Sequence, residues 1–224
     1  MEDNVLGTSI CPTDFTTAAR RHGRHFSRYL LAARQAGDKR ILDAACGGGF
    51  GAAYMARTAR SVLGVDLDDE MLRIARSAFS APNLTFARHD LHDPFGPDVR
   101  FDLITSFETM EHVRDPDVCI ANFARAMAPD GVLMLSVPNG AKELRDGDFE
   151  PSHLVHFSAD DLSRMTGRCF AQVEPYSQVL HRGLAHYARK LIGTGRHHAK
   201  DYRFVPGFDD AAKVWLAICR GPRV

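Results

Sequence analysis

Three side chains in the segment "SFETMEHV" have types and spacing that could move a proton or bind a metal ion. Glu108, Glu111 and His112 stand at positions i, i+3 and i+4, so a helical turn would place them on one face. A histidine exchanges protons near neutral pH, and a neighbouring carboxylate can orient the imidazole and stabilise its cation. We therefore predict that His112 removes a proton from a substrate or positions that substrate. The alternative is that His112 and Glu111 tie loops together.

Two more histidines follow in the segment "PSHLVH". His153 and His156 could join the two glutamates and His112 in a site of mixed oxygen and nitrogen ligands, which suits Mg2+, Mn2+ or Zn2+. This metal site is the less favoured alternative, and we assign no metal ligands. We expect His153 and His156 to line the substrate pocket or to hold a loop in place.

The segments that must position these side chains alternate between apolar runs and helical patterns. Helices are expected over about 15–33, after the glycine-rich turn near residue 48, from Asp68, over Pro116–Met127 and from Ser158. The runs expected to form seven strands are "ILDAA", "SVLGVDL", "LTFARHD", "FDLITSFE", "GVLMLSVPN", "RCFAQVEP" and "KVWLAICR". Such alternation is typical of a parallel sheet covered on both faces. The sequence therefore predicts a doubly wound, mostly parallel α/β domain.

The glycine-rich turn "ILDAACGGGFG" must be assigned to one kind of ligand. Gly47, Gly49 and Ala52 match the spacing of a dinucleotide-binding turn, but Asp43 just before the turn would face two phosphates there, and a like charge is costly. A sulfonium and an ammonium group would instead attract this carboxylate. The string Asp43, Ala45, Gly47, Gly49 resembles the D/E-x-G-x-G-x-G motif of class I methyltransferases that use S-adenosylmethionine (SAM). Ala45 replaces the first glycine of that motif, which we expect to cost little.

The resemblance implies a Rossmann-like fold and a set of cofactor-binding residues. Asp66 would accept from both ribose hydroxyls, and Asp90 in "RHDL" would accept from the adenine amino group. The remaining residues implied to bind the cofactor are Leu67 and Leu91 beside the adenine, Ser106 at the end of the fourth strand, and His25 and Arg28 over the SAM carboxylate. The carboxyl ends of parallel strands meet at one edge of the sheet, so we expect these residues in a single crevice.

The segments "SFETMEHV" and "APDGVLMLSVPN" resemble methyltransferases that act on small molecules and glycans, and the Glu-x-x-Glu-His core is similar to that of ubiquinone-pathway O-methyltransferases. The resemblance implies O-methylation of a small hydroxylated metabolite, such as a sugar, a glycan precursor or a natural product. Three alternatives stay open. The first is an N-methyltransferase for a small amine or amino sugar. The second is a metal-dependent methyltransferase of RNA 3'-end 2'-hydroxyls, whose metal site the Glu2His2 set resembles. The third is a SAM-binding partner subunit without activity.

We expect a single domain over 1–224, with a helical cap over 1–36, a SAM-binding core over 37–140 and an acceptor-side region over 141–224. An insertion over about 176–211 is expected to cover the carboxyl edge of the sheet. Within it, "LAHYARKLIG" has helical spacing. Four basic residues of this insertion could attract a phosphorylated or nucleotide-linked acceptor: Arg182, Arg189, Lys190 and Arg196.

The composition of the chain bears on which partners and which cellular compartment we expect. The formal net charge is zero, which lacks the basic excess of a dedicated nucleic-acid-binding protein, so we do not expect a nucleic-acid partner. No apolar run approaches the ~20 residues of a membrane span. Five cysteines without a CxxC pair favour a reducing compartment, and together with the polar start of the chain they lead us to expect a cytoplasmic protein.

Overall fold

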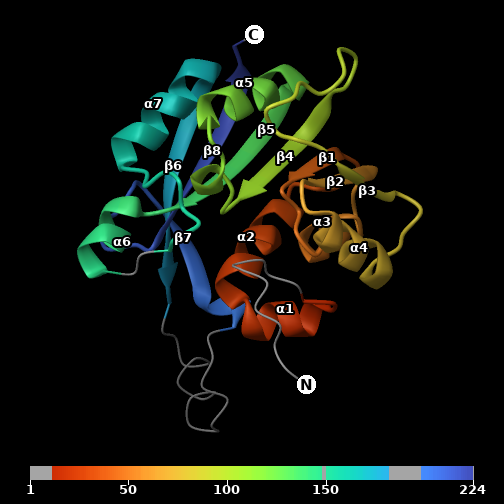
Figure 1. Ribbon diagram of the computed structural model, residues 1–224, viewed down its shortest axis with the longest axis horizontal. Helices are drawn as coiled ribbons and strands as arrows, with labels where there is room; N and C mark the ends of the chain where they lie inside the picture. Colours follow the sequence, from red (N-terminus) through yellow and green to blue (C-terminus); the bar gives the residue numbers. More distant parts are fainter. Residues whose placement is uncertain (1–11, 148–149, 182–197, 224) are drawn as a thin grey trace, which may run out of the picture.

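The computed structural model describes residues 12–147, 150–181 and 198–223, and these form one mixed sheet between two layers of helices (Figure 1). The sheet has the strand order β3-β2-β1-β4-β5-β8-β6-β7. Neighbouring strands from β3 to β5 are parallel, and the pairs β5–β8, β8–β6 and β6–β7 are antiparallel. The strands are β1 (Arg40–Ala44), β2 (Ser61–Asp66), β3 (Leu84–Arg88), β4 (Phe101–Phe107), β5 (Met127–Pro138), β6 (Phe170–Leu180), β7 (Tyr202–Pro206) and β8 (Val214–Pro222). The predicted doubly wound, mostly parallel α/β fold is confirmed.

Helices cover both faces of the sheet and bury two apolar clusters. They are α1 (Phe15–Arg21), α2 (Gly23–Ala33), α3 (Phe50–Met55), α4 (Asp69–Ala78), α5 (Pro116–Ala126), α6 (Gly140–Asp146) and α7 (Ala159–Cys169), with short 3-10 turns η1 (Met110–His112) and η2 (Ala199–Asp201). Helices α5 and α7 lie together on one face, whereas α1 to α4 lie on the other (Figure 1). Successive side chains of β4 point to opposite faces of the sheet. Leu103 belongs to the cluster under α1 to α4, and Ile104 belongs to the cluster under α5 and α7.

Helices α4 and α7 begin at residues whose side chains satisfy free backbone N–H groups. Asp68 accepts from the backbone nitrogens of Glu70 and Met71 at the start of α4. Ser158 and Asp161 form a reciprocal capping box at the start of α7, as the serine followed three residues later by an acid predicts.

Three details differ from the sequence-based expectation. The sheet has eight strands rather than seven, because 202–206 pairs with β6 as an additional edge strand. The expected helix over 15–33 is divided at His22, whose φ of −120° and ψ of 35° interrupt the helical backbone. Within the expected insertion, 176–180 extends β6, while the predicted helix "LAHYARKLIG" and Arg182, Arg189, Lys190 and Arg196 lie outside the described residues.

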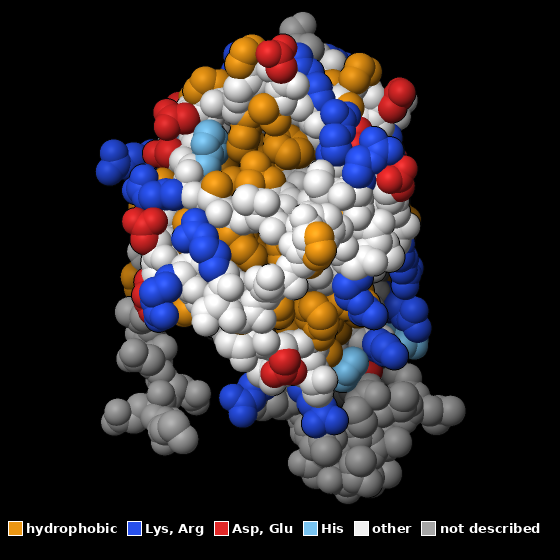
Figure 2. Space-filling view, turned by 90° about the vertical axis from the view of Figure 1, so that its right-hand side faces the viewer, with side chains coloured by type: hydrophobic (Ala, Val, Ile, Leu, Met, Phe, Trp, Pro, Cys, Tyr) orange, Lys and Arg blue, Asp and Glu red, His pale blue; other side chains and the backbone are white. Residues whose placement is uncertain are grey.

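Basic and acidic side chains are mixed over the face seen in Figure 2, in agreement with the formal net charge of zero. Of the helices that the structure describes, none combines the length and the apolar character needed to cross a bilayer.

Candidate active site

A cavity of about 1070 Å³ lies beyond the carboxyl ends of the parallel strands. The following predicted site residues line it: His25, Arg28, Ala45, Gly47, Asp66, Leu67, Asp90, Leu91, Glu108, Glu111, His112 and His153. Asp43, Gly49, Ser106 and His156 are not among the lining residues. The structure thus brings most of the predicted cofactor-side and acceptor-side residues together around one cavity, as expected for ligands of an open α/β sheet.

Asp66 closes the glycine-rich turn as well as facing the cavity. Its Oδ2 accepts from the backbone nitrogen of Gly47 at 2.8 Å, and its Oδ1 accepts from the backbone nitrogen of Asp68 at 3.0 Å. Ala45 in the same turn has a φ of 60°, in the left-handed region. An alanine pays roughly 1–2 kcal/mol for this conformation, so the replacement of the motif's first glycine costs more than the sequence suggested.

Asp43 lies beneath the cavity rather than on its wall. Its carboxylate is fully buried, and Oδ1 accepts from the Tyr29 hydroxyl at 3.1 Å and from Thr105 Oγ1 at 2.7 Å. Its Oδ2 has no hydrogen-bond partner among the described residues. Burial raises the pKa of Asp43 to about 7. These hydrogen bonds tie the carboxylate to α2 and β4, and its attraction to a cofactor cation stays a prediction.

Gly49 also serves packing. Its φ is +79°, and a Cβ at this position would lie 2.7 Å from Cβ of Ala75 and 2.7 Å from Cζ of Phe86. Ser106 is fully buried and its hydroxyl has no hydrogen-bond partner in the described parts of the chain. Both residues belong to the layer behind the cavity wall.

Asp90 is held by a residue that sequence reasoning missed. Its Oδ1 accepts from the backbone nitrogen of His92 at 2.9 Å and from Nδ1 of the same residue at 2.8 Å, and these bonds lower the pKa of Asp90. Nε2 of His92 in turn accepts from the backbone nitrogen of Asp115. His92 therefore links the predicted adenine-binding loop to the start of α5.

The N-terminal helices supply a buried cation at the opposite end of the cavity. Arg28 is 1% exposed; Nη1 donates to Gln178 Oε1 at 2.8 Å and Nη2 to His25 Nδ1 at 2.6 Å. Burial and the nearby Arg28 charge hold the pKa of His25 well below its usual value, so His25 is a neutral acceptor. Nη2 also lies 3.8 Å from Glu108 Oε2, which connects this end to the acceptor side.

Glu108, Glu111 and His112 do not share the single helical turn that their spacing predicts. Glu108 precedes the 3-10 turn η1 and has a φ of 54°, a strained backbone for a residue with a side chain. Its backbone nitrogen donates to the Ser136 carbonyl at 3.0 Å, and the Ser136 hydroxyl lies 3.3 Å from Oε1. The strain is maintained by these contacts with β5, and all three side chains still line the cavity.

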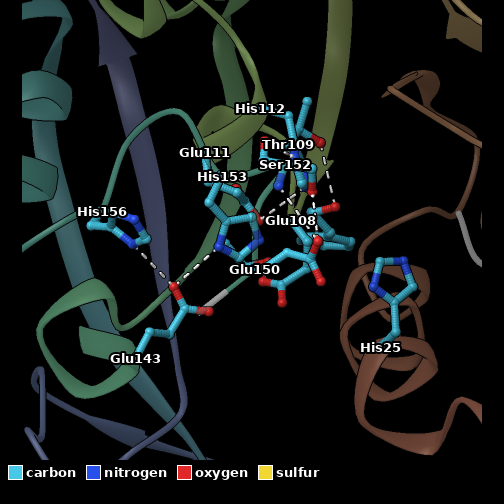
Figure 3. A network of polar contacts seen from close by, with 12 residues as sticks. His25, Glu108, Thr109, Glu111, His112, Glu143, Glu150, Ser152, His153 and His156 are labelled. Carbon is cyan, nitrogen blue, oxygen red and sulfur yellow. Dashed lines mark hydrogen bonds and ion pairs between the residues drawn. The ribbon is translucent and has the colours of Figure 1, made fainter. Parts of the chain in front are cut away.

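Glu111 is a buried carboxyl group aimed into the site (Figure 3). It is 1% exposed, and neither carboxyl oxygen has a hydrogen-bond partner among the described residues. Burial, followed by the charge of Glu108, raises the pKa of Glu111 well above its ordinary value. Its carbonyl accepts from the backbone nitrogens of Leu154 and Val155, so the loop that carries His153 is fixed to η1.

His112 presents one defined nitrogen to this carboxyl group. Nδ1 lies 3.0 Å from the Ser152 carbonyl oxygen, which can only accept, so Nδ1 carries the proton. A neutral ring then keeps its lone pair on Nε2, which lies 3.9 Å from Glu111 Oε1. The ring centroids of His112 and His153 are 4.9 Å apart.

Glu143 of α6 joins the two later histidines and was not predicted. Its Oε2 lies 3.1 Å from His153 Nδ1 and 3.5 Å from His156 Nδ1 (Figure 3). A glutamate in the first turn of a helix is ordinary, so the sequence carried no signal for this contact. The described residues contain two sets of possible metal ligands, and within each set the ligand atoms lie within 4.8 Å of one another. The sets are Glu111, His112 and His153, and Glu143, His153 and His156.

Comparison with known proteins identifies the class to which this fold and cavity belong. A family model described as a methyltransferase domain matches residues 18–168, which is more than half of the chain. The chain belongs to this methyltransferase family, and the predicted family, fold class and SAM cofactor are confirmed.

Two curated proteins illustrate the relatives to which this chain is similar. The chain is 31% identical over 165 residues to a "Probable S-adenosylmethionine-dependent methyltransferase" of Mycolicibacterium smegmatis, covering 72% of this chain and 63% of the relative. It is 35% identical over 108 residues to the ubiquinone biosynthesis O-methyltransferase of Actinobacillus pleuropneumoniae, covering 45% and 46% of the two chains. The chain therefore spans about half to two thirds of the length of these curated relatives.

A solved structure supports the fold. A SAM-dependent methyltransferase of Thermotoga maritima, described as a "possible histamine N-methyltransferase", superposes with a TM-score of 0.67 and 14% identity, covering 92% of this chain and 93% of the other. At this identity the likeness concerns the fold alone.

Proposed function

We propose that this protein is a SAM-dependent methyltransferase that methylates a hydroxyl group of a small molecule. The observation that carries the proposal is the His112 ring, which lines the same cavity as Gly47 and Asp66. Its Nδ1 donates to the Ser152 carbonyl, so a neutral ring keeps its lone pair on Nε2. A base and a cofactor-binding turn around one cavity are what deprotonation coupled to group transfer requires.

The residues of the cavity fit the cofactor. Asp66 and Asp90 offer carboxylates for the ribose and adenine, Leu67 and Leu91 offer apolar contacts, and Arg28 offers a cation for the cofactor carboxylate. When bound, SAM supplies an electrophilic methyl group on a sulfonium whose sulfur becomes a neutral thioether after transfer. The chain's part is to align the acceptor oxygen, since alignment alone is worth ~7–11 kcal/mol, and to receive the hydroxyl proton on His112 Nε2.

The charges around the acceptor side favour a neutral acceptor, such as a sugar or another polyhydroxylated molecule. The carboxyl groups there belong to Glu108, Glu111, Asp115, Glu143 and Glu150. Three basic residues, Arg114, Lys142 and Lys213, also line the cavity here, and Lys142 Nζ pairs with Asp146 at 2.7 Å, so the five acids outnumber them. A phosphorylated acceptor would face these acids, and the basic segment proposed to attract it lies outside the described residues.

Calorimetric titration with S-adenosylhomocysteine, followed by methyl transfer to a panel of sugars, phenols, amines and an RNA 3' end, tests the proposal. We expect His112→Ala to keep cofactor binding and to lose ~10²–10⁴-fold in kcat for hydroxyl acceptors. His181→Ala, which removes an exposed histidine outside the cavity, is the matched control. Turnover of amines alone, with His112→Ala fully active, would favour the N-methyltransferase alternative because a neutral amine needs no base. Tight cofactor binding without turnover of any acceptor would favour a partner subunit.

One observation favours a second candidate, a metal-dependent O-methyltransferase. Glu111 is buried with both oxygens lacking a hydrogen-bond partner in the described chain, and it lies within 4.8 Å of donor atoms of His112 and His153. A divalent ion would compensate a buried carboxylate and could hold the acceptor hydroxyl. Activity that is lost in EDTA and restored by Mg2+, Mn2+ or Zn2+ would support this candidate, whereas full activity in EDTA would leave His112 as the base.

A further inference from the structure

The contact between Glu143 and His153 joins two elements at the acceptor side of the cavity. Glu143 lies on α6, and His153 lies in the loop that precedes α7. Their side chains are only 18% and 9% exposed, and Glu143 Oε2 is 3.1 Å from His153 Nδ1. A hydrogen bond to an ionised carboxylate in a site largely shielded from water is stronger than one on the surface.

This contact selects one tautomer of His153. An ionised carboxylate only accepts hydrogen bonds, so Nδ1 carries the ring proton, and a neutral imidazole then has its lone pair on Nε2. The second ring nitrogen of His153 points away from Glu143, toward the residues around His112 (Figure 3). Since His112 is held in the same tautomer by Ser152, the two neighbouring rings both offer a lone pair.

The helix that carries Glu143 is docked tightly against the histidine loop. The backbone nitrogen of Gly140 donates to the Phe157 carbonyl at 3.0 Å. A Cβ on Gly140 would lie 2.5 Å from the carbonyl carbon of His156, so only glycine permits this approach. Asn139 caps the same helix by accepting from the backbone nitrogen of Lys142 and donates to the Asp210 and Ala212 carbonyls. The carboxylate is therefore presented by a rigid support.

We propose that Glu143 is the positioning residue of the acceptor site: it holds His153 in the Nδ1–H tautomer so that the Nε2 lone pair stands beside that of His112. The tautomer is a property of the protein alone. Its use, to orient the acceptor hydroxyl or to bind a metal ion, rests on the proposed function. Without the carboxylate, an Nε2–H would leave no lone pair to accept a hydrogen bond from the acceptor O–H or to bind a metal ion.

The test is the ring ¹⁵N spectrum of protein labelled at histidine, recorded with neither cofactor nor acceptor at a pH where the rings are neutral. His153→Asn identifies the signals of His153 among the eleven histidines. We expect Nδ1–H as the major form in the native protein and in Glu143→Gln, whose amide oxygen still accepts. In Glu143→Leu we expect loss of this form in favour of Nε2–H.

Three controls make the outcome decisive. His112 should stay in the Nδ1–H form in Glu143→Leu, because its partner is the Ser152 carbonyl. Leu144→Ala alters an exposed side chain on the same helix and should leave His153 unchanged. Calorimetric binding of S-adenosylhomocysteine reports that each variant is folded. Two results overturn the proposal even if methyl transfer is found: His153 of the native protein in the Nε2–H form, or a His153 tautomer that Glu143→Leu does not change in a folded protein. The spectra do not depend on activity, so a failure to find methyl transfer leaves this test valid.

Discussion

The carboxylate of Asp66 accepts from the backbone nitrogen of Gly47 at 2.8 Å, so the residue predicted to bind ribose also fixes the glycine-rich turn. Two substitutions separate these roles. Asp66→Asn keeps an oxygen for Gly47 but loses the charge, and we expect roughly 10-fold weaker binding of S-adenosylhomocysteine. Asp66→Ala loses both and should weaken binding by ~100-fold or more. Calorimetric titration measures both; equal affinities for Asp66→Asn and Asp66→Ala would show that the turn does not depend on this bond.

Ala45→Gly should stabilise the protein. The φ of Ala45 is 60°, and glycine adopts this conformation without the penalty that a Cβ brings. The greater freedom of glycine in the unfolded chain offsets part of the gain, which leaves an increase of up to about 1 kcal/mol and a rise in Tm of ~2–4 °C. Thermal unfolding measures this change. As a comparison, Ala53→Gly within α3 should lower Tm, because glycine disfavours a helix interior; a lowered Tm in Ala45→Gly would contradict the prediction.

Asp43 should make stability depend on pH. Its folded pKa of about 7 lies above its ordinary value of 3.8, so the stabilisation by the protonated form is fully present below about pH 4 and is lost as the pH rises to about 7. One pKa unit corresponds to about 1.4 kcal/mol, so the free energy of unfolding should fall by about 4 kcal/mol relative to Asp43→Asn across this window. Denaturant unfolding at several pH values measures the free energy of unfolding of both proteins. The difference between them removes the contribution of the titratable groups that they share. A constant difference would show that Asp43 does not titrate in this range.

Glu111→Gln should raise the free energy of unfolding and lower methyl transfer. The substitution removes a buried carboxyl group whose charge is repelled by Glu108, so we expect a gain of about 1–2 kcal/mol at pH 8 in the presence of EDTA. Methyl transfer should fall, because the group beside His112 Nε2 is lost. Glu150→Gln changes a half-buried acid of the same cavity and should leave the unfolding free energy within about 0.5 kcal/mol. A less stable Glu111→Gln would indicate that the carboxyl group has a stabilising partner.

The parts of the site predicted from the sequence are those attached to strand ends. Asp66 and Asp90 follow successive parallel strands, and the geometry of such a sheet brings its carboxyl ends to one edge. Glu108 and His112 were predicted from their spacing instead, and they also line this cavity. The sheet itself was predictable because β5 and β8 contain nearly continuous apolar runs, which are typical of strands that are covered on both faces.

The contacts that sequence reasoning missed come from segments far apart in the chain. Gln178 reaches Arg28 across 150 positions, and Glu143 reaches His153 from an ordinary helical position. The motif around Asp43 also could not reveal that Tyr29 and Thr105 surround its carboxylate, because neither residue belongs to the motif. Side-chain direction at a turn depends on φ and ψ, as the left-handed backbone of Glu108 illustrates.

The hydrogen bond between buried Arg28 and Gln178 bears on the direction from which the cofactor can enter the cavity. Arg28 is 1% exposed and Gln178 is 4% exposed, and their bond fastens α2 to β6, so this end of the cavity is a fixed wall in the described chain. Leu67 at the adenine end is 48% exposed. If the cofactor places its carboxylate at Arg28, as we predict, its methionine end meets a wall closed by this bond, and the expected route of entry is the more open end at Leu67.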